Sequence, residues 1–578
     1  MQTEKTLTGY PSIDKPWLKY YSEEAINAPL PECTIYEYLW ENNKDHLEDV
    51  ALIYFGRKIT YKELFENIDK CQKSLTAIGV KEKDIVTIAL PSIPEAVYLV
   101  YAINKMGAIA NMIHPLAGEN EIRDYLNEVS SSVCLMFTGT YDIVKNSLKD
   151  TTVKIAVVIS AADSLPFGIK QIYKLKSKEP SLPSGVAIIN WKTFINKGKN
   201  MVVHTVKKDS NETAIISHTG GTTGVPKGVM CSDKSINTVI WEISCCFPHQ
   251  RQERMMVVLP PFINYNLVNA IFEGLAFGFQ DILIPDYKPE LFAKYVTKYQ
   301  PNHINSIPPY LEALLNIPEL KTMDLSCLSH ILYGGEGMDP QKEEEINELL
   351  ISRNAQYKIG KGLGATELVS AATVAFDNTN LLGSAGIPLV KVNCKIVDPN
   401  SDNECAYNEI GEICFSGPQL MIGYYHNQEA TDEIIKIHSD GERWIHTGDL
   451  GYVNEDGVLF VSGRIKRIIL TKGSDGSPTK MFPDRIEKVI MQCPSVDLCC
   501  VIGIPDKARV NYAKAAIVLK DGVSATNKIT DEILQLCKEQ LPVYMIPEEI
   551  EYLPDLPRTE RGKVDYRTLE QMAEKQAK

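Results

Sequence analysis

The spacing of apolar residues predicts an amphipathic helix between Tyr61 and Ile78. Apolar side chains recur there at alternating gaps of four and three residues, at Leu64, Ile68, Cys71, Leu75 and Ile78. Residues with this spacing share one face of an α-helix, and Gly79 directly after them supplies a stop. We therefore expect a helix with one buried face that ends at this glycine.

The next segments alternate between strand-like and helix-like patterns. Asp84 to Leu90 is a short run typical of a buried strand, Pro94 to Lys105 is typical of a helix, and another apolar stretch begins at Ala108. Such alternation favours strand–helix–strand units. The pattern predicts an α/β fold with a largely parallel sheet.

The length of the chain predicts more than one packed unit, because 578 residues exceed what a single hydrophobic core usually holds. The segment from Val461 to Arg467 is the clearest candidate for a domain boundary. The residues after it are expected to form a small α+β domain. Thr530 is the predicted N-cap of a helix in this domain that runs from Asp531 to Leu541.

Composition narrows the class of protein. With 44% apolar and 23% charged residues the chain has the make-up of an ordinary globular protein. The formal net charge of −14 argues against a nucleic-acid-binding surface. We see no signal pattern and no run of about 18 to 20 apolar residues that would cross a bilayer. Fourteen cysteines without a repeated spacing indicate reduced thiols, so a cytoplasmic location is expected.

A glycine-rich run from Ser217 to Gly228 has the composition of a phosphate-binding loop. Glycines let several backbone N–H groups face one anion, hydroxyls add donors, and a lysine adds charge. The candidate ligands are Thr219, Gly220, Gly221, Thr222, Thr223, Gly224 and Lys227. The lysine precedes its glycine, so the run differs from the Walker loop of GTPases and kinases. A flexible surface loop is the alternative interpretation.

Four further segments follow in the C-terminal part of the chain. They are Tyr333 to Gly337, Gly360 to Glu367, Trp444 to Tyr452 with Gly463-Arg464 after it, and Leu556 to Asp565. Read alone, Gly360 to Ala365 satisfies a loose dinucleotide fingerprint. The acidic residue expected after that fingerprint is not evident, so a dinucleotide oxidoreductase is an alternative with no other motif behind it.

Together and in this order, the five motifs resemble those of the AMP-forming adenylating enzymes, which include acyl-CoA synthetases, luciferase-like ligases and peptide-synthetase adenylation domains. The resemblance implies a large N-terminal domain over residues 1–463, with mostly parallel sheets packed by helices and a smaller β-barrel-like subdomain. It further implies a hinge at residues 464–466, where Lys466 is the hinge residue, and a mobile α+β domain over residues 467–578.

The resemblance also implies roles for individual residues. Thr366 would face the α-phosphate of ATP, and Glu367 would hold Mg²⁺, an ion that prefers carboxylate and phosphate oxygens. Asp449 would accept hydrogen bonds from the ribose hydroxyls, and Arg464 would meet the ribose or a phosphate. The adenine side is implied at Gly335, Glu336, Gly337, Leu363 and Gly364, with Leu363 at a position where the family usually has an aromatic residue.

The reaction implied by these parts is attack of a carboxylate on the α-phosphate of ATP, which gives an acyl adenylate and pyrophosphate. Positioning and electrostatics do most of this work. Lys563 is the candidate catalytic residue, because its ammonium would neutralise the approaching carboxylate and the charge that develops around the phosphate. In the family the small domain then rotates and admits a thiol, usually that of CoA.

The candidate acyl pocket lies in the segment Leu259 to Asn266, and its predicted residues are Phe262, Asn264, Tyr265 and Tyr333. This segment has no acidic residue to pair with a substrate ammonium, which disfavours amino acids. Ile263 stands where many acyl-CoA synthetases have histidine. The phosphate loop and the segment Lys15 to Tyr21 look most like those of medium- to long-chain fatty acyl-CoA synthetases.

Other interpretations of the chain stay open. A ligase that passes its adenylate to the phosphopantetheine arm of an acyl carrier protein is the nearest, because the segment 473–480 departs from the turn that approaches the thiol in this family. A non-catalytic nucleotide sensor with the same fold is the second. The lysine-, proline- and serine-rich region 160–200 has no assigned use.

Overall fold

The computed structural model describes residues 7–166, 186–203, 206–219, 227–399, 401, 403–472, 478–506, 509–558 and 564–576. The chain divides into two compact units. The larger unit comprises Lys15–Asn393 and Phe415–Ile445, and the smaller unit comprises Met1–Asp14, Cys394–Cys414 and His446–Lys578. The domain boundary expected at residues 464–466 stays a prediction.

An eight-stranded sheet of the larger unit has the strand order β19-β9-β8-β4-β3-β5-β6-β7. Its strands are β3 (Ile85–Ala89), β4 (Ile109–Met112), β5 (Val133–Phe137), β6 (Ile155–Ile159), β7 (Ala187–Asn190), β8 (Thr213–His218), β9 (Gly228–Ser232) and β19 (Gly423–Tyr424). The strands from β8 to β7 pair in parallel, whereas β9 and β19 are antiparallel to their neighbours.

A seven-stranded sheet of the same unit has the order β14-β13-β12-β10-β11-β1-β2. Its strands are β1 (Val50–Tyr54), β2 (Arg57–Thr60), β10 (Arg254–Val257), β11 (Gln280–Leu283), β12 (His303–Ser306), β13 (His330–Tyr333) and β14 (Gly360–Lys361). All pairs are parallel except β1 with β2. The predicted α/β fold with mostly parallel sheets is confirmed.

The larger unit also contains helices, as parallel strands require covering on their two faces. They are α2 (Glu23–Asn27), α3 (Ile35–Asn43), α4 (Tyr61–Ala77), α5 (Pro94–Lys105), α6 (Glu119–Glu128), α7 (Tyr141–Ser147), α9 (Trp191–Gly198), α10 (Asp233–Ser244), α11 (Asn264–Asn266), α12 (Glu273–Ala276), α13 (Phe292–Tyr299), α14 (Pro308–Glu312), α15 (Pro340–Ser352) and α16 (Gln428–Ile434). The helix predicted from apolar spacing is α4, and Gly79 after it has a φ of 95°. No helix in the described part of the chain is both long and apolar enough to span a membrane.

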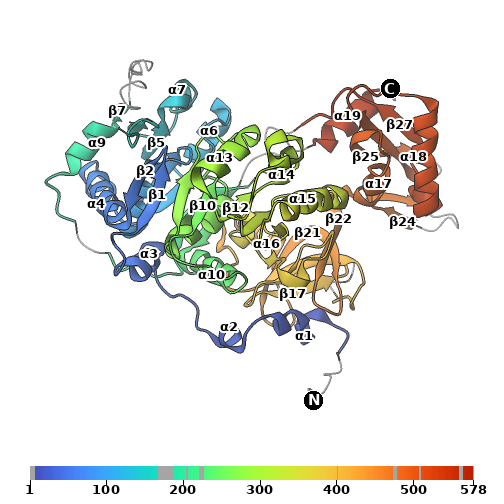
Figure 1. The fold of residues 1–578 in the computed structure, drawn as a ribbon, viewed down its shortest axis with the longest axis horizontal. Coiled ribbons are helices and arrows are strands. Elements are labelled where there is room, and N and C mark those ends of the chain that lie inside the picture. Colours follow the sequence, from blue (N-terminus) through green and yellow to red (C-terminus); the bar gives the residue numbers. More distant parts are fainter. Residues whose placement is uncertain are drawn as a thin grey trace. The chain divides into compact units, whose positions relative to one another are not determined.

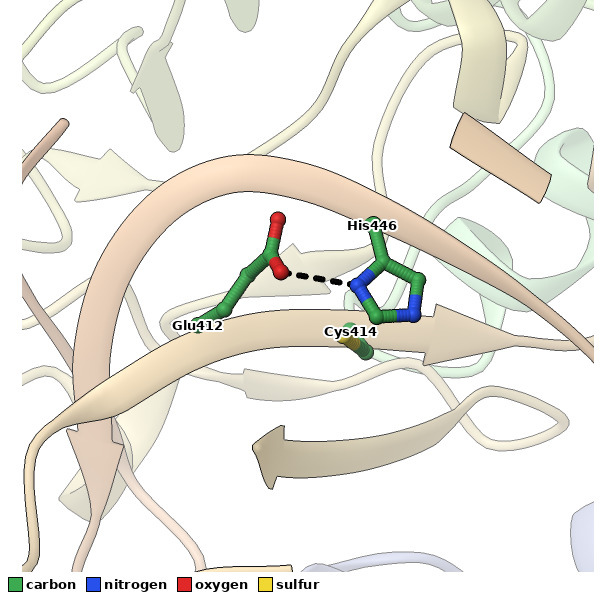
Figure 2. Close-up of side chains that lie close together, drawn as sticks. All are labelled: Glu412, Cys414 and His446. Carbon is green, nitrogen blue, oxygen red and sulfur yellow. Dashed lines mark hydrogen bonds and ion pairs between the residues drawn. The ribbon is translucent and has the colours of Figure 1, made fainter. Parts of the chain in front are cut away.

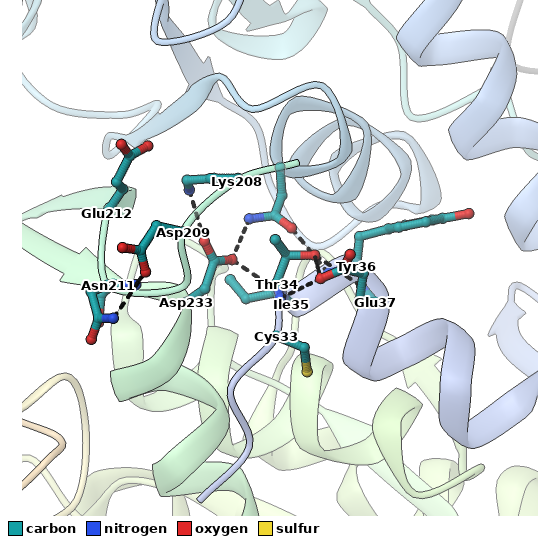
Figure 3. A network of polar contacts seen from close by, with 12 residues as sticks. Cys33, Thr34, Ile35, Tyr36, Glu37, Lys208, Asp209, Asn211, Glu212 and Asp233 are labelled. Atoms are coloured by element: carbon teal, nitrogen blue, oxygen red, sulfur yellow. Dashed lines mark hydrogen bonds and ion pairs between the residues drawn. The ribbon is translucent and has the colours of Figure 1, made fainter. Parts of the chain in front are cut away.

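A buried polar network fixes the N-terminal segment of the larger unit against α5 and α10 (Figure 3). Asp233 accepts hydrogen bonds from the backbone N–H of Ile35 at 2.9 Å and from the side chain of Asn104 at 2.5 Å. Lys208 Nζ lies 2.7 Å from the other carboxylate oxygen, and both charged side chains are almost completely buried. Each of the two buried side chains therefore has its counter-charge within hydrogen-bonding distance.

We expect Lys208→Met to lower the free energy of unfolding by about 3 to 5 kcal/mol, because it leaves the Asp233 carboxylate buried without a counter-charge. Urea denaturation followed by circular dichroism measures this loss. The exposed neighbour Lys207 provides the matched control, Lys207→Met. An equal effect of the two substitutions would contradict the importance of the buried pair.

A second buried carboxylate makes stability depend on pH. Burial of Glu242 on α10 raises its pKa to about 8, although the backbone N–H of Lys391 donates to it at 2.7 Å. The unfolded chain has a glutamate pKa of about 4.3, so the folded chain holds a proton that the unfolded chain releases between those values. The stability contributed by this group is complete below about pH 4.3 and is lost as the pH rises through about 8.

Glu242→Gln is therefore expected to be more stable than the parent chain above about pH 8, by on the order of 5 kcal/mol, and to differ little from it at about pH 4. The glutamine keeps an acceptor for Lys391 but cannot ionise. Urea unfolding of both chains across this pH range measures the difference, with Glu344→Gln at an exposed position of α15 as the control. A difference that does not vary with pH would contradict the assignment.

The smaller unit contains a three-stranded sheet, β25 (Val496–Asp506), β26 (Val510–Leu519) and β27 (Glu549–Tyr552), together with the hairpin β23 (Ile469–Lys472) and β24 (Pro478–Met481). Its helices are α1 (Pro11–Asp14), α17 (Pro483–Ile490), α18 (Asn527–Gln540) and α19 (Tyr566–Gln576). Helices α17 and α19 pack against β25, and α17 contacts α18 (Figure 1). The predicted small α+β domain is confirmed.

One helix start in this unit was wrongly predicted. Helix α18 begins a turn before Asp531, and its N-cap is Thr526, whose side chain accepts a hydrogen bond from the N–H of Ile529 at 3.4 Å. Thr530 lies inside the helix and donates to the carbonyl of Thr526. Both threonines can cap a helix, and the apolar residues used to place the start lie only in the later turns.

A further set of strands lies before the three-stranded sheet in the chain. They are β17 (Asn393–Val397), β18 (Gly411–Ser416), β20 (Ile435–Ile437), β21 (Arg443–Val453) and β22 (Leu459–Arg464). Strand β21 pairs antiparallel with β22, and β18 neighbours β21 in the same sheet. Short pairs complete the described strands at β15 (Thr373–Val374) and β16 (Ile387–Pro388).

Candidate functional site

The two ends of the predicted phosphate loop lie next to each other. The N–H of Thr219, after β8, donates to the carbonyl of Lys227, before β9, at 3.1 Å. The residues Gly220, Gly221, Thr222, Thr223 and Gly224 lie outside the described residues. The predicted loop thus connects two antiparallel neighbours of the sheet.

A glutamate beside this loop contacts both of its flanks. Glu128, the last residue of α6, accepts a hydrogen bond from the N–H of Gly228 at 2.9 Å. Its second oxygen lies 3.3 Å from Nδ1 of His218, and Nε2 of that histidine lies 2.7 Å from Oδ1 of Asn111. These contacts hold the ends of β8 and β9 to α6 and β4.

The predicted metal-binding carboxylate and the loop lysine meet at a tyrosine. Tyr424 donates from its hydroxyl to Oε1 of Glu367 at 2.7 Å, and the ammonium of Lys227 lies 5.0 Å from the centre of its ring. Burial and the nearby Glu367 raise the pKa of Tyr424, so its hydroxyl keeps the proton that it donates. The larger unit therefore brings together a cation and a carboxylate from segments far apart in the chain.

Backbone geometry around Glu367 is strained. Thr366 and Glu367 lie in a single 3₁₀ turn, and Val369 after it has a φ of 64°. This conformation is unusual for a β-branched residue, and such outliers cluster at functional sites. The carbonyl of Glu367 accepts a hydrogen bond from the N–H of Met421 at 2.9 Å, which ties the turn to the segment that carries Tyr424.

The glycines that satisfy the dinucleotide fingerprint have another explanation. A Cβ atom at Gly362 would collide with the carbonyl of Thr373, and one at Gly364 would collide with the carbonyl of Ser370. Glycine is thus needed here because two backbone segments pack closely. Leu363 lies between these glycines with its N–H donating to Thr373 Oγ1 at 2.9 Å. The fold accounts for the spacing without a dinucleotide.

The predicted acyl residues lie near the carboxyl ends of parallel strands. Phe262 stacks on His114, with ring centres 4.3 Å apart. Asn264 begins helix α11 and accepts a hydrogen bond from Ser217, which lies on β8 beside the phosphate loop. The helix continues through a π-helical turn over Leu267–Phe272, a feature frequent at functional sites.

Tyr333 and Tyr265 lie in the same core of the larger unit. Tyr333, at the end of β13, donates to Glu343 at 3.1 Å, and the same carboxylate pairs with the buried Lys361. After β13 come Gly335, Glu336 and Gly337, all exposed, and Gly335 has a φ of 87° that favours glycine. This turn is accessible to a ligand.

The smaller unit carries the remaining residues of the predicted site. Asp449 on β21 pairs with Arg464 on β22, with Oδ1 and Nε 2.9 Å apart. Glu412 on β18 contacts the residues just before Asp449 through His446 (Figure 2). Lys466 lies in a 3₁₀ turn directly after β22. The predicted catalytic residue Lys563 lies outside the described residues.

Sequence reasoning missed three residues that the structure places at these motifs. Tyr424, Glu128 and Glu412 each contact a predicted residue or its immediate neighbour. Glu412 lies 36 positions before its partner Gly448, and Tyr424 lies 57 positions after Glu367. No local pattern links residues at such separations in a single sequence.

Comparison with known proteins gives two family matches. Residues 39–425 match the AMP-binding enzyme model, and residues 485–563 match the AMP-binding enzyme C-terminal domain model. A long-chain-fatty-acid–CoA ligase of Bacillus subtilis is 28% identical, over 96% of this chain and 97% of that protein. A protein of Dictyostelium discoideum named probable 4-coumarate–CoA ligase 1 is also 28% identical, over 94% and 96%.

Solved structures agree in fold. The ATP-bound MatB of Rhodopseudomonas palustris has a TM-score of 0.79 at 20% identity, and the match covers 94% of this chain and 99% of that one. The anthranilate CoA ligase AuaEII in complex with anthranoyl-AMP has a TM-score of 0.77 at 21% identity, with 95% and 98% covered. At these identities the likeness establishes the architecture.

Proposed function

The chain belongs to the AMP-binding enzyme family, and from this premise we propose that it activates a medium- or long-chain fatty acid to its acyl adenylate and then transfers the acyl group to CoA. It is an AMP-forming acid–thiol ligase, as the family models and the curated relatives indicate. The first step consumes ATP and releases pyrophosphate; the second forms a thioester and releases AMP.

The observation that carries this proposal is the group formed by Lys227, Tyr424 and Glu367. It combines a cation at the end of a glycine-rich loop with a carboxylate whose direction is fixed by a hydroxyl at 2.7 Å. A cation suits phosphate oxygens, and a carboxylate beside it suits a divalent ion bound to those oxygens. Polyphosphate chemistry needs both.

The donor set around Glu367 fits Mg²⁺. Oε1 of Glu367 accepts a hydrogen bond from Tyr424, and that contact does not use the second carboxylate oxygen. Mg²⁺ is commonly bound by one or two carboxylates together with phosphate oxygens, so this carboxylate suits the ion. When bound, Mg²⁺ would supply charge neutralisation at the phosphates. Thr366 would donate to the α-phosphate, and the hydroxyl of Tyr424 would hold the Glu367 carboxylate in its orientation.

Roles for the other predicted residues follow the family. Asp449 would accept from the ribose hydroxyls while Arg464 holds its carboxylate in place at 2.9 Å. Lys563 would stabilise the developing charge during attack of the carboxylate. Lys466 as a hinge and the exposed turn from Gly335 to Gly337 as the adenine side belong to the same proposal.

The fatty-acid assignment is supported by two observations. The acyl segment carries no carboxylate for a substrate ammonium, and the residues near its start, Phe262 and Ile263, are apolar. Relatives that span nearly the whole chain are named long-chain-fatty-acid–CoA ligases. Another relative of equal identity is named for 4-coumarate, so an aromatic acid is the principal competing substrate class.

CoA is the proposed acceptor, and the thiol of an acyl carrier protein is its competitor. We place the reaction in the cytoplasm, because fourteen cysteines without a repeated spacing are typical of a chain with reduced thiols. The formal charge of −14 gives no reason to expect nucleic acid as a partner.

The deciding experiment incubates the purified protein with ATP, Mg²⁺ and a panel of fatty, aromatic and amino acids, with and without CoA. Mass spectrometry then measures pyrophosphate, AMP and thioester. We expect thioester only with fatty acids of medium or long chain. Thioester from aromatic acids would overturn the substrate class, and acid-dependent pyrophosphate with thioester formed only on a carrier protein would overturn the acceptor. ATP binding without pyrophosphate from any acid would indicate a nucleotide sensor.

A further inference from the structure

One glutamate connects the backbone on both sides of Thr447, close to the predicted ribose ligand Asp449, to a neighbouring strand. Glu412 lies on β18, and its Oε2 is 2.7 Å from Nδ1 of the buried His446. Its other oxygen, Oε1, accepts a hydrogen bond from the N–H of Gly448 at 3.0 Å. Figure 2 shows the carboxylate of Glu412 directed at the imidazole. The two contacts lie on either side of Thr447.

Thr447 makes a further connection between this part of β21 and β18. Thr447 donates from its hydroxyl to the carbonyl of Ile413 at 2.7 Å, and the N–H of Asp449 donates back to that hydroxyl at 3.1 Å. Gly448 lies within β21, directly before Asp449, and has a φ of 71°, a conformation that favours glycine. The direction of the Asp449 carboxylate therefore depends on contacts with residues 412 and 413.

The same group contains a third side chain with metal-binding chemistry. Possible ligand atoms of Glu412, Cys414 and His446 all lie within 4.8 Å of one another. Thiolate, imidazole and carboxylate are the ligands that zinc takes in proteins. However, both oxygens of Glu412 already have donors, one of them a backbone N–H that no metal would replace. Hydrogen bonding accounts for this carboxylate without an ion.

We propose that Glu412 is a positioning residue for nucleotide binding, which acts through His446 and Gly448 to hold the Asp449 carboxylate in the direction that receives the ribose hydroxyls. This inference rests on the proposed function, since it assigns Asp449 to the ribose. A carboxylate is suited to the task because its two oxygens accept from two separate donors at once. The position is partly buried, so water competes weakly for those donors.

The test compares Glu412→Ala with Glu412→Gln by calorimetric titration with AMP and with ATP. The alanine variant loses both contacts, and we expect up to about 100-fold weaker nucleotide binding, the scale for a small misplacement of a binding group. Glutamine keeps an oxygen for the Gly448 N–H and an amide toward His446, so it should restore most of the affinity. Glu409→Ala, an exposed glutamate of the same segment, is the matched control.

Steady-state kinetics supplies a readout that a merely structural role would not produce. In Glu412→Ala, the KM for ATP should rise while the KM for the acid and the KM for CoA stay near the parent values. Equal losses in all three, with a lowered melting temperature in both variants, would overturn the proposal in favour of general destabilisation. Unchanged nucleotide binding in Glu412→Ala would overturn it directly.

Elemental analysis of the purified parent chain distinguishes the positioning role of Glu412 from a zinc site at the same residues. Stoichiometric zinc that persists through dialysis and is lost in Glu412→Ala would replace the positioning role by a metal centre. If the parent chain itself binds neither AMP nor ATP, the proposed function fails. If the parent chain binds nucleotide and Glu412→Ala binds it equally tightly, only the positioning role of Glu412 fails.

Discussion

Replacing Lys563 by alanine is expected to slow acyl-adenylate formation by about 10²- to 10³-fold, the usual loss when one strong transition-state donor is removed. The carboxylate and the α-phosphate are both anionic, and the ammonium of Lys563 would offset their repulsion as the bond forms. The lysine is assigned from the motif Leu556 to Asp565. Acid-dependent pyrophosphate release, measured in single turnover, gives the rate.

The second half-reaction distinguishes this role from a general defect. Thioester formation from supplied acyl adenylate should proceed in Lys563→Ala at close to the parent rate, because no new charge at the α-phosphate has to be neutralised there. Lys575→Ala, which removes an exposed lysine from α19, should leave both half-reactions unchanged. Equal slowing of the two half-reactions in Lys563→Ala would contradict the assignment of Lys563 to the adenylation step alone.

Removing the carboxylate of Glu367 is expected to raise the Mg²⁺ concentration for half-maximal adenylation by about 10- to 100-fold or more, the range seen even when only the support of a metal ligand is lost. The reason is that Glu367 is the acidic side chain that the structure places beside Lys227 through Tyr424. A titration of activity with Mg²⁺ at saturating ATP measures the shift in Glu367→Ala.

Tyr424→Phe offers a graded companion to this experiment. It keeps the ring that faces Lys227 but removes the hydroxyl on Glu367, so its Mg²⁺ requirement should lie between those of the parent chain and Glu367→Ala. Glu429→Ala, at an exposed position of α16, serves as the control for loss of a carboxylate. An unchanged Mg²⁺ response in Glu367→Ala would refute the metal-binding role of this residue.

The proposed chemistry divides into motifs that stand in both compact units of the chain. The larger unit carries the predicted phosphate loop, Glu367 and the predicted acyl segment, and the smaller unit carries Asp449 and Arg464. In each unit, a glutamate accepts a hydrogen bond from a backbone N–H of the motif and lies beside a histidine: Glu128 with His218, and Glu412 with His446. Partly buried acceptors of this kind restrain motifs whose glycines would otherwise leave the backbone free.

Local sequence patterns were sufficient to predict a helix or strand wherever that element buries one of its faces. The spacing of apolar residues predicted α4 to within a residue of its end, and Pro94–Lys105 is a helix with the predicted bounds. The short apolar runs became parallel strands because both faces of such a sheet are covered. The order of the glycine, threonine and acidic motifs likewise indicated the family, since each motif is contiguous in the chain.

Local sequence patterns were not sufficient where two nearby residues could both cap a helix, or where glycine could serve either a ligand or close backbone packing. Thr526 and Thr530 are both suitable N-caps, and only the folded helix shows that Thr526 is used. The glycines from Gly360 to Gly364 fit a nucleotide fingerprint, but the close approach of the backbone at Ser370 and Thr373 explains two of them. A single sequence holds no record of which backbone segments will pack together.

Local sequence patterns were enough to identify the family and the alternation of strands and helices, and to propose the residues that carry the chemistry, because each of these rests on neighbours within one segment. The tertiary structure alone decided which side chains support them. Tyr424 reaches Glu367, Glu128 reaches Gly228, and Glu412 reaches Gly448 only after strands distant in the chain have paired. Hydrogen bonds act over about 3 Å in space whatever the separation along the chain, and so these contacts leave no periodic signal in the sequence.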